Sequence, residues 1–426
     1  MNPLSVLFIV YKSIKQTAFS CIITIFSLGL AFALILCAFM IQKQTRRAFV
    51  MQQPGFDAVM GPRSSQLQLV LNSIYHIEDS PGKISWKKLQ ILKRPPYKKM
   101  IKYAIPYVVG DNFYGYRIVG TTNELFTEYE MVDGQDEDGN DTFKKITFSE
   151  GRPFKEDKTE AVVGSFVAHK LNLKLGDIIT PFHGLNFDPD SKHNQEFKVV
   201  GIMESTNNPM DHVIYTPIEP IYRMEGHEIN GQTFEEGEKI DKEYWEISAV
   251  LVKMKSPVAG VIISDQINRG DTGLTMAFSV VKIMQEFYDK MEWVIKIFEY
   301  MAYLVLIVAA ITVLTGIYNT MDQRRREFAI YRAVGANRFQ LLIIIVAQST
   351  SIAIMGSLVG YVIYYFTFKS IAYFVKEKVG INFDVFYEHP IIWIAPLVMI
   401  GLGIVAGILP AIKAYMTDVS KHLNTT

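Results

Sequence analysis

Few residues in this chain are of the types needed for metal or covalent chemistry, and their spacing matches no standard centre. His183, His193 and His212, with Asp211, lie in one part of the sequence and are of types that bind zinc, but their spacing fits no standard zinc pattern. Neither a Gly-x-Ser-x-Gly nucleophile motif nor a Gly-x-x-x-x-Gly-Lys-Ser/Thr phosphate loop occurs. We therefore interpret these histidines as surface residues of loops, and expect no catalytic residue and no metal or cofactor site in the chain.

The most informative feature is a charged stretch from Asn319 to Arg338, between two long uncharged runs. Phe328, Tyr331 and Val334 recur every three residues among arginines, and this spacing predicts a short amphipathic helix ending at Gly335. Such a helix can offer an apolar stripe and cationic groups to a cytoplasmic partner or to lipid phosphate. The alternative is that the arginines only fix membrane topology. The candidate contact residues are Arg324, Arg325, Arg326, Glu327, Phe328, Tyr331, Arg332, Val334 and Gly335.

Four windows without Asp, Glu, Lys or Arg flank or follow this stretch. They are Gln16–Gln42, Tyr300–Met321, Phe339–Phe368 and His389–Ile412. Each reaches the roughly 20 residues that cross a bilayer as a helix. The fold class predicted is a polytopic α-helical membrane protein with four transmembrane helices and a large extracytoplasmic α+β domain between the first and second.

The charge distribution sets the expected orientation and excludes one class of partner. By the positive-inside rule, the basic residues near the ends and in the arginine stretch place both termini and that stretch in the cytoplasm, although Lys43, Arg46 and Arg47 at the outer end of the first span run against the rule. Basic and acidic residues are equal at 43 each, and no long basic run interleaves aromatic residues, which argues against nucleic acid.

The outer segment reads as a mixture of strands and helices that leads into a long helix. Phe197-Lys-Val-Val-Gly-Ile-Met is typical of its strands, and 165–173 and 256–268 are typical of helices. Before the second span, three-and-four spacing predicts a helix that starts near Met276 and continues into the membrane as a stalk. The candidate stalk residues are Ile283, Phe287 and Met291.

Small residues in the last two spans predict close helix packing. Gly356 and Gly360, and likewise Gly403 and Gly407, are four positions apart, so each pair lies on one helix face. The polar residues 348–351 in the third span are interpreted as interhelical hydrogen-bonding groups in preference to a transport path.

Three groups of residues together resemble the ABC transporter permeases of the MacB, FtsX and LolC/LolE type. Arg326-Glu-Phe-Ala-Ile-Tyr-Arg-Ala-Val-Gly-Ala336 is similar to the family's Arg-Glu-Ile-Gly followed by Ala-hydrophobic-Gly-Ala. Gly401 to Ala414, with its Pro-Ala exit, resembles the family's last span, and the outer Gly151-Arg-Pro-Phe and Ala161-Val-Val-Gly resemble its extracytoplasmic core. Two positions depart from the pattern, Ala329 for a glycine and Gln348 for a glutamate.

The resemblance implies a permease subunit without ATPase activity of its own, whose ATP and Mg²⁺ are bound by a separate ABC ATPase. Two permeases, identical or related, would pair above two ATPases, with the inner helix as coupling element; membrane lipid and a periplasmic adaptor or lipoprotein are further expected partners. Residues 1–18 would form a cytoplasmic amphipathic helix, 19–41, 293–318, 341–367 and 390–413 the spans, 42–292 the MacB-like core domain with stalks at both ends, 319–340 the coupling loop, 368–389 a short outer loop and 414–426 the cytoplasmic tail.

The expected location is the bacterial inner membrane, and the expected function is export or extraction of an envelope substrate such as a lipoprotein, lipid, peptide or drug. One alternative is a membrane scaffold or mechanotransmitter that regulates an extracytoplasmic partner and moves no substrate. Another is an enzyme, which rests only on the histidines described above. Association with an ATPase separates the transporter from both.

Overall fold

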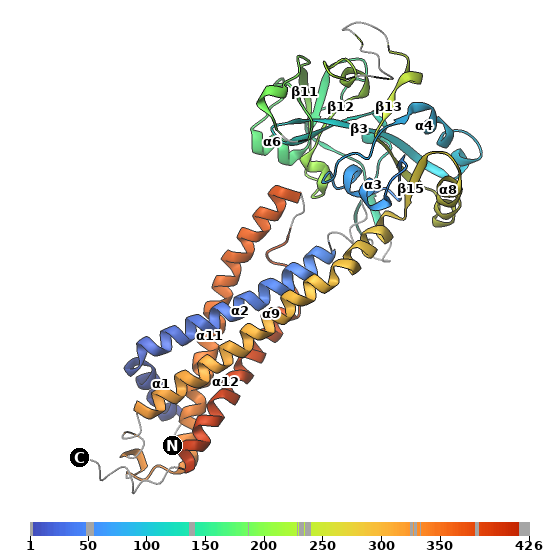
Figure 1. Ribbon diagram of the computed structural model, residues 1–426. Coiled ribbons are helices and arrows are strands. Elements are labelled where there is room, and N and C mark those ends of the chain that lie inside the picture. Colours follow the sequence, from blue (N-terminus) through green and yellow to red (C-terminus); the bar gives the residue numbers. More distant parts are fainter. Residues whose placement is uncertain are drawn as a thin grey trace. The chain divides into compact units, whose positions relative to one another are not determined.

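In the computed structural model, the chain divides into two compact units (Figure 1). One contains residues 1–45, 291–373 and 384–426, and the other contains residues 46–290 and 374–383. The structure describes residues 3–47, 55–135, 141–185, 187–227, 229, 234, 240–323, 327, 330–332, 334–379 and 383–416.

The first unit is helical. The helices fully within its described residues are α1 (Pro3–Gln16), α2 (Ala18–Arg46), α9 (Val280–Gln323, from Met291 onward), α11 (Arg338–Val379) and α12 (Ile391–Met416). Four of them, all but α1, are long and apolar enough to cross a membrane. These four run alongside one another in Figure 1.

Helix α9 starts later than the sequence pattern indicated. Met276 belongs to strand β15 (Leu274–Phe278), where it pairs with Met60, and the helix begins at Val280. The prediction of a start near Met276 is therefore wrong. Met276 and Ala277 are both buried on opposite faces of a strand, and a short apolar run of this kind does not distinguish a strand from a helix by periodicity alone.

The second unit is an α+β domain built on one large mixed sheet of eleven strands. The strand order is β15-β1-β14-β3-β4-β12-β8-β11-β7, with β10 paired to β3 and β9 paired to β11. Strand β12 is parallel to β4 and β11 is parallel to β8, while the other pairs are antiparallel.

The bounds of this domain's strands are β1 (Ala58–Pro62), β2 (Ile84–Ser85), β3 (Ile101–Phe113), β4 (Tyr116–Thr121), β5 (Met131–Gln135), β6 (Asp141–Lys144), β7 (Phe148–Gly151), β8 (Glu160–Val163), β9 (Ile178–Ile179), β10 (Phe182–His183), β11 (Phe197–Met203), β12 (Ile214–Pro217), β13 (Glu246–Ile247), β14 (Ala249–Met254) and β15. Its shorter helices are α3 (Gln66–Ser73), α4 (Trp86–Leu92), α5 (Glu124–Thr127), α6 (Ser165–Leu171), α7 (Ile218–Ile221) and α8 (Pro257–Arg269), with single 3₁₀ turns at Tyr97–Lys99, Pro189–Ser191, Pro209–His212 and Lys242–Tyr244.

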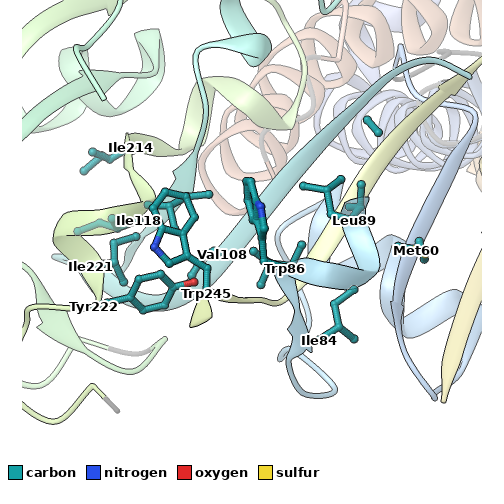
Figure 2. Packing of buried hydrophobic residues seen from close by; sticks show 14 of the residues in the cluster. Met60, Ile84, Trp86, Leu89, Val108, Ile118, Ile214, Ile221, Tyr222 and Trp245 are labelled. Carbon is teal, nitrogen blue, oxygen red and sulfur yellow. The ribbon is translucent and has the colours of Figure 1, made fainter. Parts of the chain in front are cut away.

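The sheet is buried on both faces, because successive residues of its strands enter different cores. Val108 belongs to a first cluster and Val109 to a second, and Ala58 and Val59 alternate in the same way. In the first cluster, Trp86 at the start of α4 meets Trp245 edge to face at 5.0 Å (Figure 2). These two cores hold the domain together without a disulfide, because both cysteines lie in α2.

Candidate functional site

The charged stretch forms a helical turn that ends at Gly335, as far as its described residues show. The Gly335 N–H donates to the Arg332 carbonyl at 3.0 Å, and the Ala336 N–H donates to the Tyr331 carbonyl at 2.9 Å. Gly335 has a φ of 102°, in the left-handed region that a side chain disfavours. This pair of bonds is the Schellman arrangement that terminates helices.

The next helix starts almost at once. The Asn337 side-chain oxygen accepts from the Phe339 N–H, and the Gln340 side-chain oxygen accepts from the Asn337 N–H, at 2.6 and 2.9 Å. This reciprocal capping box fixes the first turn of α11. Only Ala336 lies between the two motifs, so the short helix and α11 are joined by a defined turn.

This turn presents apolar side chains to the outside of the chain. Val334 is 83% exposed and Ile330 is 50% exposed, and their spacing of four places them on one helix face. Phe339, at the start of α11, is also exposed. Sequence reasoning named Val334 but missed Ile330 and Phe339, because it followed the three-residue spacing instead of the four-residue one.

Only some of the other residues in the predicted contact set are among the described residues. Tyr331, Arg332 and Glu327 are half-buried. Arg324, Arg325, Arg326 and Phe328 lie outside the described residues, as does Ala329.

Two of the four candidate packing glycines bring α11 against α2. A Cβ at Gly360 would lie 2.6 Å from Phe32 Cδ1 and 2.9 Å from the Gly29 carbonyl oxygen, and one at Gly356 would lie 2.8 Å from Leu28 Cβ. Real Cβ atoms do not approach so closely, so the backbones of these helices pack at a distance that only glycine allows.

The other two glycines bring α12 against another part of α11. A Cβ at Gly403 would lie 2.6 Å from Ala353 Cβ, and one at Gly407 would lie 2.1 Å from Ser349 Oγ. Helix α11 thus contacts both α2 and α12 through small residues.

The polar residues of α11 form hydrogen bonds between and within helices. Ser13 of α1 donates to the Gln348 side-chain oxygen at 2.7 Å, and both residues are buried. Ser349 and Thr350 donate to the Val346 carbonyl of their own helix. The Gln348 bond joins two helices, as interpreted from the sequence, whereas the bonds of Ser349 and Thr350 stay within α11.

The three candidate stalk residues occupy different environments along α9. Ile283 is 8% exposed and belongs to the second core cluster of the α+β domain, and Phe287 packs against that cluster. Met291 is 41% exposed and falls in the helical unit. One continuous helix therefore contributes residues to both units.

The interpretation of His183, His193 and His212 as surface residues of loops is wrong for His193, which is 5% exposed. His212 stacks on Phe166 with ring centroids 3.8 Å apart, and burial lowers the pKa of His212 to about 4. The Asp211 carboxylate accepts the backbone N–H groups of Thr206 and Asn207. These two residues therefore have local structural roles.

His183 and His193 instead converge with His227 on Asp111, a residue that sequence reasoning did not consider. Burial alone would raise the pKa of the Asp111 carboxyl, but hydrogen bonds from the three imidazoles hold that pKa well below its usual range. The same carboxylate raises the pKa of His183. Strand pairing was the missing signal, because it places His183 directly opposite Asp111.

Comparison with known families assigns both parts of the chain. Residues 21–269, more than half of the sequence, match the MacB-like periplasmic core domain, and residues 299–419 match the FtsX-like permease C-terminal family. The chain belongs to the MacB/FtsX-type ABC transporter permeases. This confirms the resemblance read from residues 326–336 and from the outer motifs.

Known proteins similar to this permease carry matching descriptions. An uncharacterized ABC transporter permease of Methanocaldococcus jannaschii is 30% identical over 230 residues, which cover 50% of this chain and 49% of that protein. The chain thus spans about half the length of this curated relative. The chain is also similar to the crystal structure of the extracellular domain of the noncanonic ABC-type transporter YknZ from Gram-positive bacteria. The match covers 52% of this chain and 99% of the YknZ domain, at 14% identity. Its TM-score of 0.29 is too low for a structural argument.

Proposed function

We propose that this permease couples ATP hydrolysis by a separate ABC ATPase to movement of its α+β domain, and that the domain lies outside the cytoplasm. The observation that carries the proposal is the exposed apolar face of Ile330 and Val334 on a short helix stopped at Gly335, between two membrane-type helices. Exposed aliphatic groups on a basic segment suit a groove in a soluble partner that is apolar inside and acidic at its rim.

A permease without a phosphate loop needs such a partner, which would bind the ATP and Mg²⁺. The candidate ATPase contacts would then lie on the cytoplasmic side of the membrane, and the α+β domain would lie on the opposite side. Helix α9, which has residues in both units, connects the two. The substrate class remains that of envelope molecules: lipoprotein, lipid, peptide or drug.

A second permease copy, or a related permease, is part of the proposal. Only 6% of the apolar window of α9 is buried within the chain, against 50% for α2. An apolar helix left this open suits lipid or another permease. The termini would be cytoplasmic and the membrane would be the bacterial inner membrane.

The test compares exposed valines in the permease, co-expressed with the ABC ATPase that we expect a neighbouring gene to encode. Val334→Asp should weaken co-purification and permease-dependent ATPase activity at least tenfold, because burying a valine contributes about 1.5 kcal/mol or more and 1.4 kcal/mol is tenfold. Gly335→Pro and Phe328→Ala should act in the same direction.

Val258→Asp is the matched control, since Val258 is 67% exposed on α8 of the α+β domain. It should leave ATPase association at the wild-type level. Equal association of the Val334→Asp and wild-type permeases would refute the docking role. A stable permease that associates with no ATPase would favour the scaffold alternative.

A further inference from the structure

We propose that Asp111, His183, His193 and His227 form a zinc site in the α+β domain. Each residue offers one ligand atom, and all four ligand atoms lie within 4.8 Å of one another. We call these four residues the His₃Asp cluster. Three of the chain's eight histidines meet here, from positions far apart in the sequence.

The distances from the Asp111 oxygen to the three imidazole nitrogens are close to those that a tetrahedral ion requires. Asp111 Oδ1 lies 3.1 Å from His193 Nε2, 3.1 Å from His227 Nε2 and 3.6 Å from His183 Nδ1. Zinc bonds of 2.0–2.1 Å in tetrahedral geometry place neighbouring ligand atoms about 3.3 Å apart. The observed distances to the carboxylate bracket that value, so small side-chain rotations would bring the remaining pairs into range.

A β-bulge in β3 places the Asp111 side chain on the same face of the sheet as His183. Between β3 and β4 the register shifts at Gly110, so that Val109 lies opposite Val119 but Asp111 lies opposite Ile118. An extra residue in one strand reverses which face the following side chain occupies. Asp111 therefore shares a face with Ile118 and also with His183, its direct partner on β10.

Backbone and side-chain contacts hold the other two histidines in place. The His193 N–H donates to the Pro181 carbonyl at 2.9 Å, and the His227 N–H donates to the Met224 carbonyl at 3.1 Å. The neighbours of these histidines are themselves joined, because Asn194 Nδ2 donates to Glu225 Oε2 at 3.3 Å. The cluster thus has a preformed arrangement of side chains.

The three rings surround a common point. Their centroids are 5.1 to 5.4 Å apart and every pair meets edge to face. A buried carboxylate needs one cationic or donor partner to offset its desolvation, and here three imidazoles converge on a single oxygen. Three imidazoles and one carboxylate form a ligand set suited to Zn²⁺, and four protein ligands are typical of a structural site.

Burial differs among the four ligands in a way that permits loading. The side chains of Asp111, His193 and His227 are 1%, 4% and 10% exposed, whereas that of His183 is 57% exposed. His183 therefore lies on the solvent side of the site. Bound zinc would tie β3, β10, the segment after Pro189–Ser191 and the turn at His227 into one unit.

The test uses the full-length permease purified in detergent through a tag without histidines, stripped with a chelator and dialysed. Zinc is then titrated in competition with a chromophoric chelator, and bound metal is counted by mass spectrometry. Wild type should bind one equivalent. His183→Ala should weaken the affinity at least 100-fold, beyond the 10- to 100-fold cost of losing an outer partner of a ligand.

His169→Ala is the matched control, because His169 is exposed on α6 and outside the cluster; it should bind zinc as wild type does. Since His183 is largely exposed, its variant should fold, which circular dichroism checks. Cobalt provides a second readout, with intense visible absorption for four-coordinate binding in wild type and its loss in His183→Ala. Wild type that binds no zinc above background, or His183→Ala with wild-type affinity, would overturn the proposal.

Discussion

Replacing Gly360 by alanine should destabilise the helical unit, whereas the same change at Gly401 should not. A Cβ at Gly360 would lie 2.6 Å from Phe32 Cδ1, 2.9 Å from Phe32 Cβ and 2.9 Å from the Gly29 carbonyl oxygen. Two of these three atoms cannot rotate away, because one is backbone and one is attached to it. Relief therefore requires that α2 and α11 move apart.

The size of the effect follows from two opposing contributions. Alanine is favoured over glycine inside a helix by about 1 kcal/mol. Forcing an extra methyl group into a packed contact costs about 1–3 kcal/mol. At Gly401 no atom of the described residues, apart from the backbone of its own helix, lies within 4 Å of the added Cβ, so only the favourable contribution applies there. The two variants should differ by about 2 kcal/mol in free energy of unfolding.

The assay is reversible denaturant unfolding of the full-length permease in detergent micelles, followed by circular dichroism. Gly407→Ala adds a useful intermediate, because the atom nearest to its Cβ is the hydroxyl of Ser349, which rotates. We expect the order Gly401→Ala, Gly407→Ala, Gly360→Ala from most to least stable. A Gly360→Ala protein as stable as Gly401→Ala would refute the inference that α2 and α11 pack at glycine distance.

Two further changes test the α+β domain. The Glu160 carboxylate accepts two N–H bonds from Arg152 at 2.8 Å each. These bonds are the main reason that the pKa of Glu160 is lowered. The resulting stabilisation is complete above the ordinary pKa of 4.5 and is lost as pH falls through the lowered value. Glu160→Gln should therefore flatten the acid side of the stability–pH profile. Ile283→Ala should cost about 3 kcal/mol on unfolding, since Ile283 is 8% exposed in the second core.

Exposed residues supply the controls for both changes: a second glutamate for Glu160, and an apolar residue of the same helix for Ile283. Glu150→Gln, at an exposed position on β7, should leave the acid profile unchanged, and Met291→Ala should cost well under the Ile283→Ala value. If the Glu160→Gln protein retains the wild-type loss of stability at acid pH, the Arg152–Glu160 ion pair is not the cause of that loss. If Ile283→Ala and Met291→Ala cost the same, the start of α9 is not part of the core.

Local patterns in the sequence were sufficient to find the membrane-type helices and the end of the short helix at Gly335. Long uncharged windows correspond to four membrane-type helices, and a glycine after an amphipathic run corresponds to a Schellman turn at Gly335. These features depend on neighbouring residues, so periodicity and residue type reveal them. Met276 shows the limit: an apolar residue beside a helix start was assigned to the helix although it pairs with Met60 in a sheet.

The His₃Asp cluster could not be predicted in the same way. Its members are separated by 72, 10 and 34 positions, and the side on which Asp111 points depends on a one-residue bulge at Gly110. A register shift of one residue moves every following side chain to the opposite face of the sheet. Neither composition nor residue spacing in the sequence predicts such a shift. Proximity in sequence instead grouped His183 and His193 with His212, which packs against Phe166.

The turn between Gly335 and Asn337 has a consequence for how force would travel through the helical unit. A flexible loop of several residues would not transmit a displacement of the short helix to α11. Here hydrogen bonds end one helix and begin the next with a single residue, Ala336, between them. If a partner displaces the short helix, this fixed turn would pass the displacement on to α11, which packs against both α2 and α12 through glycine contacts.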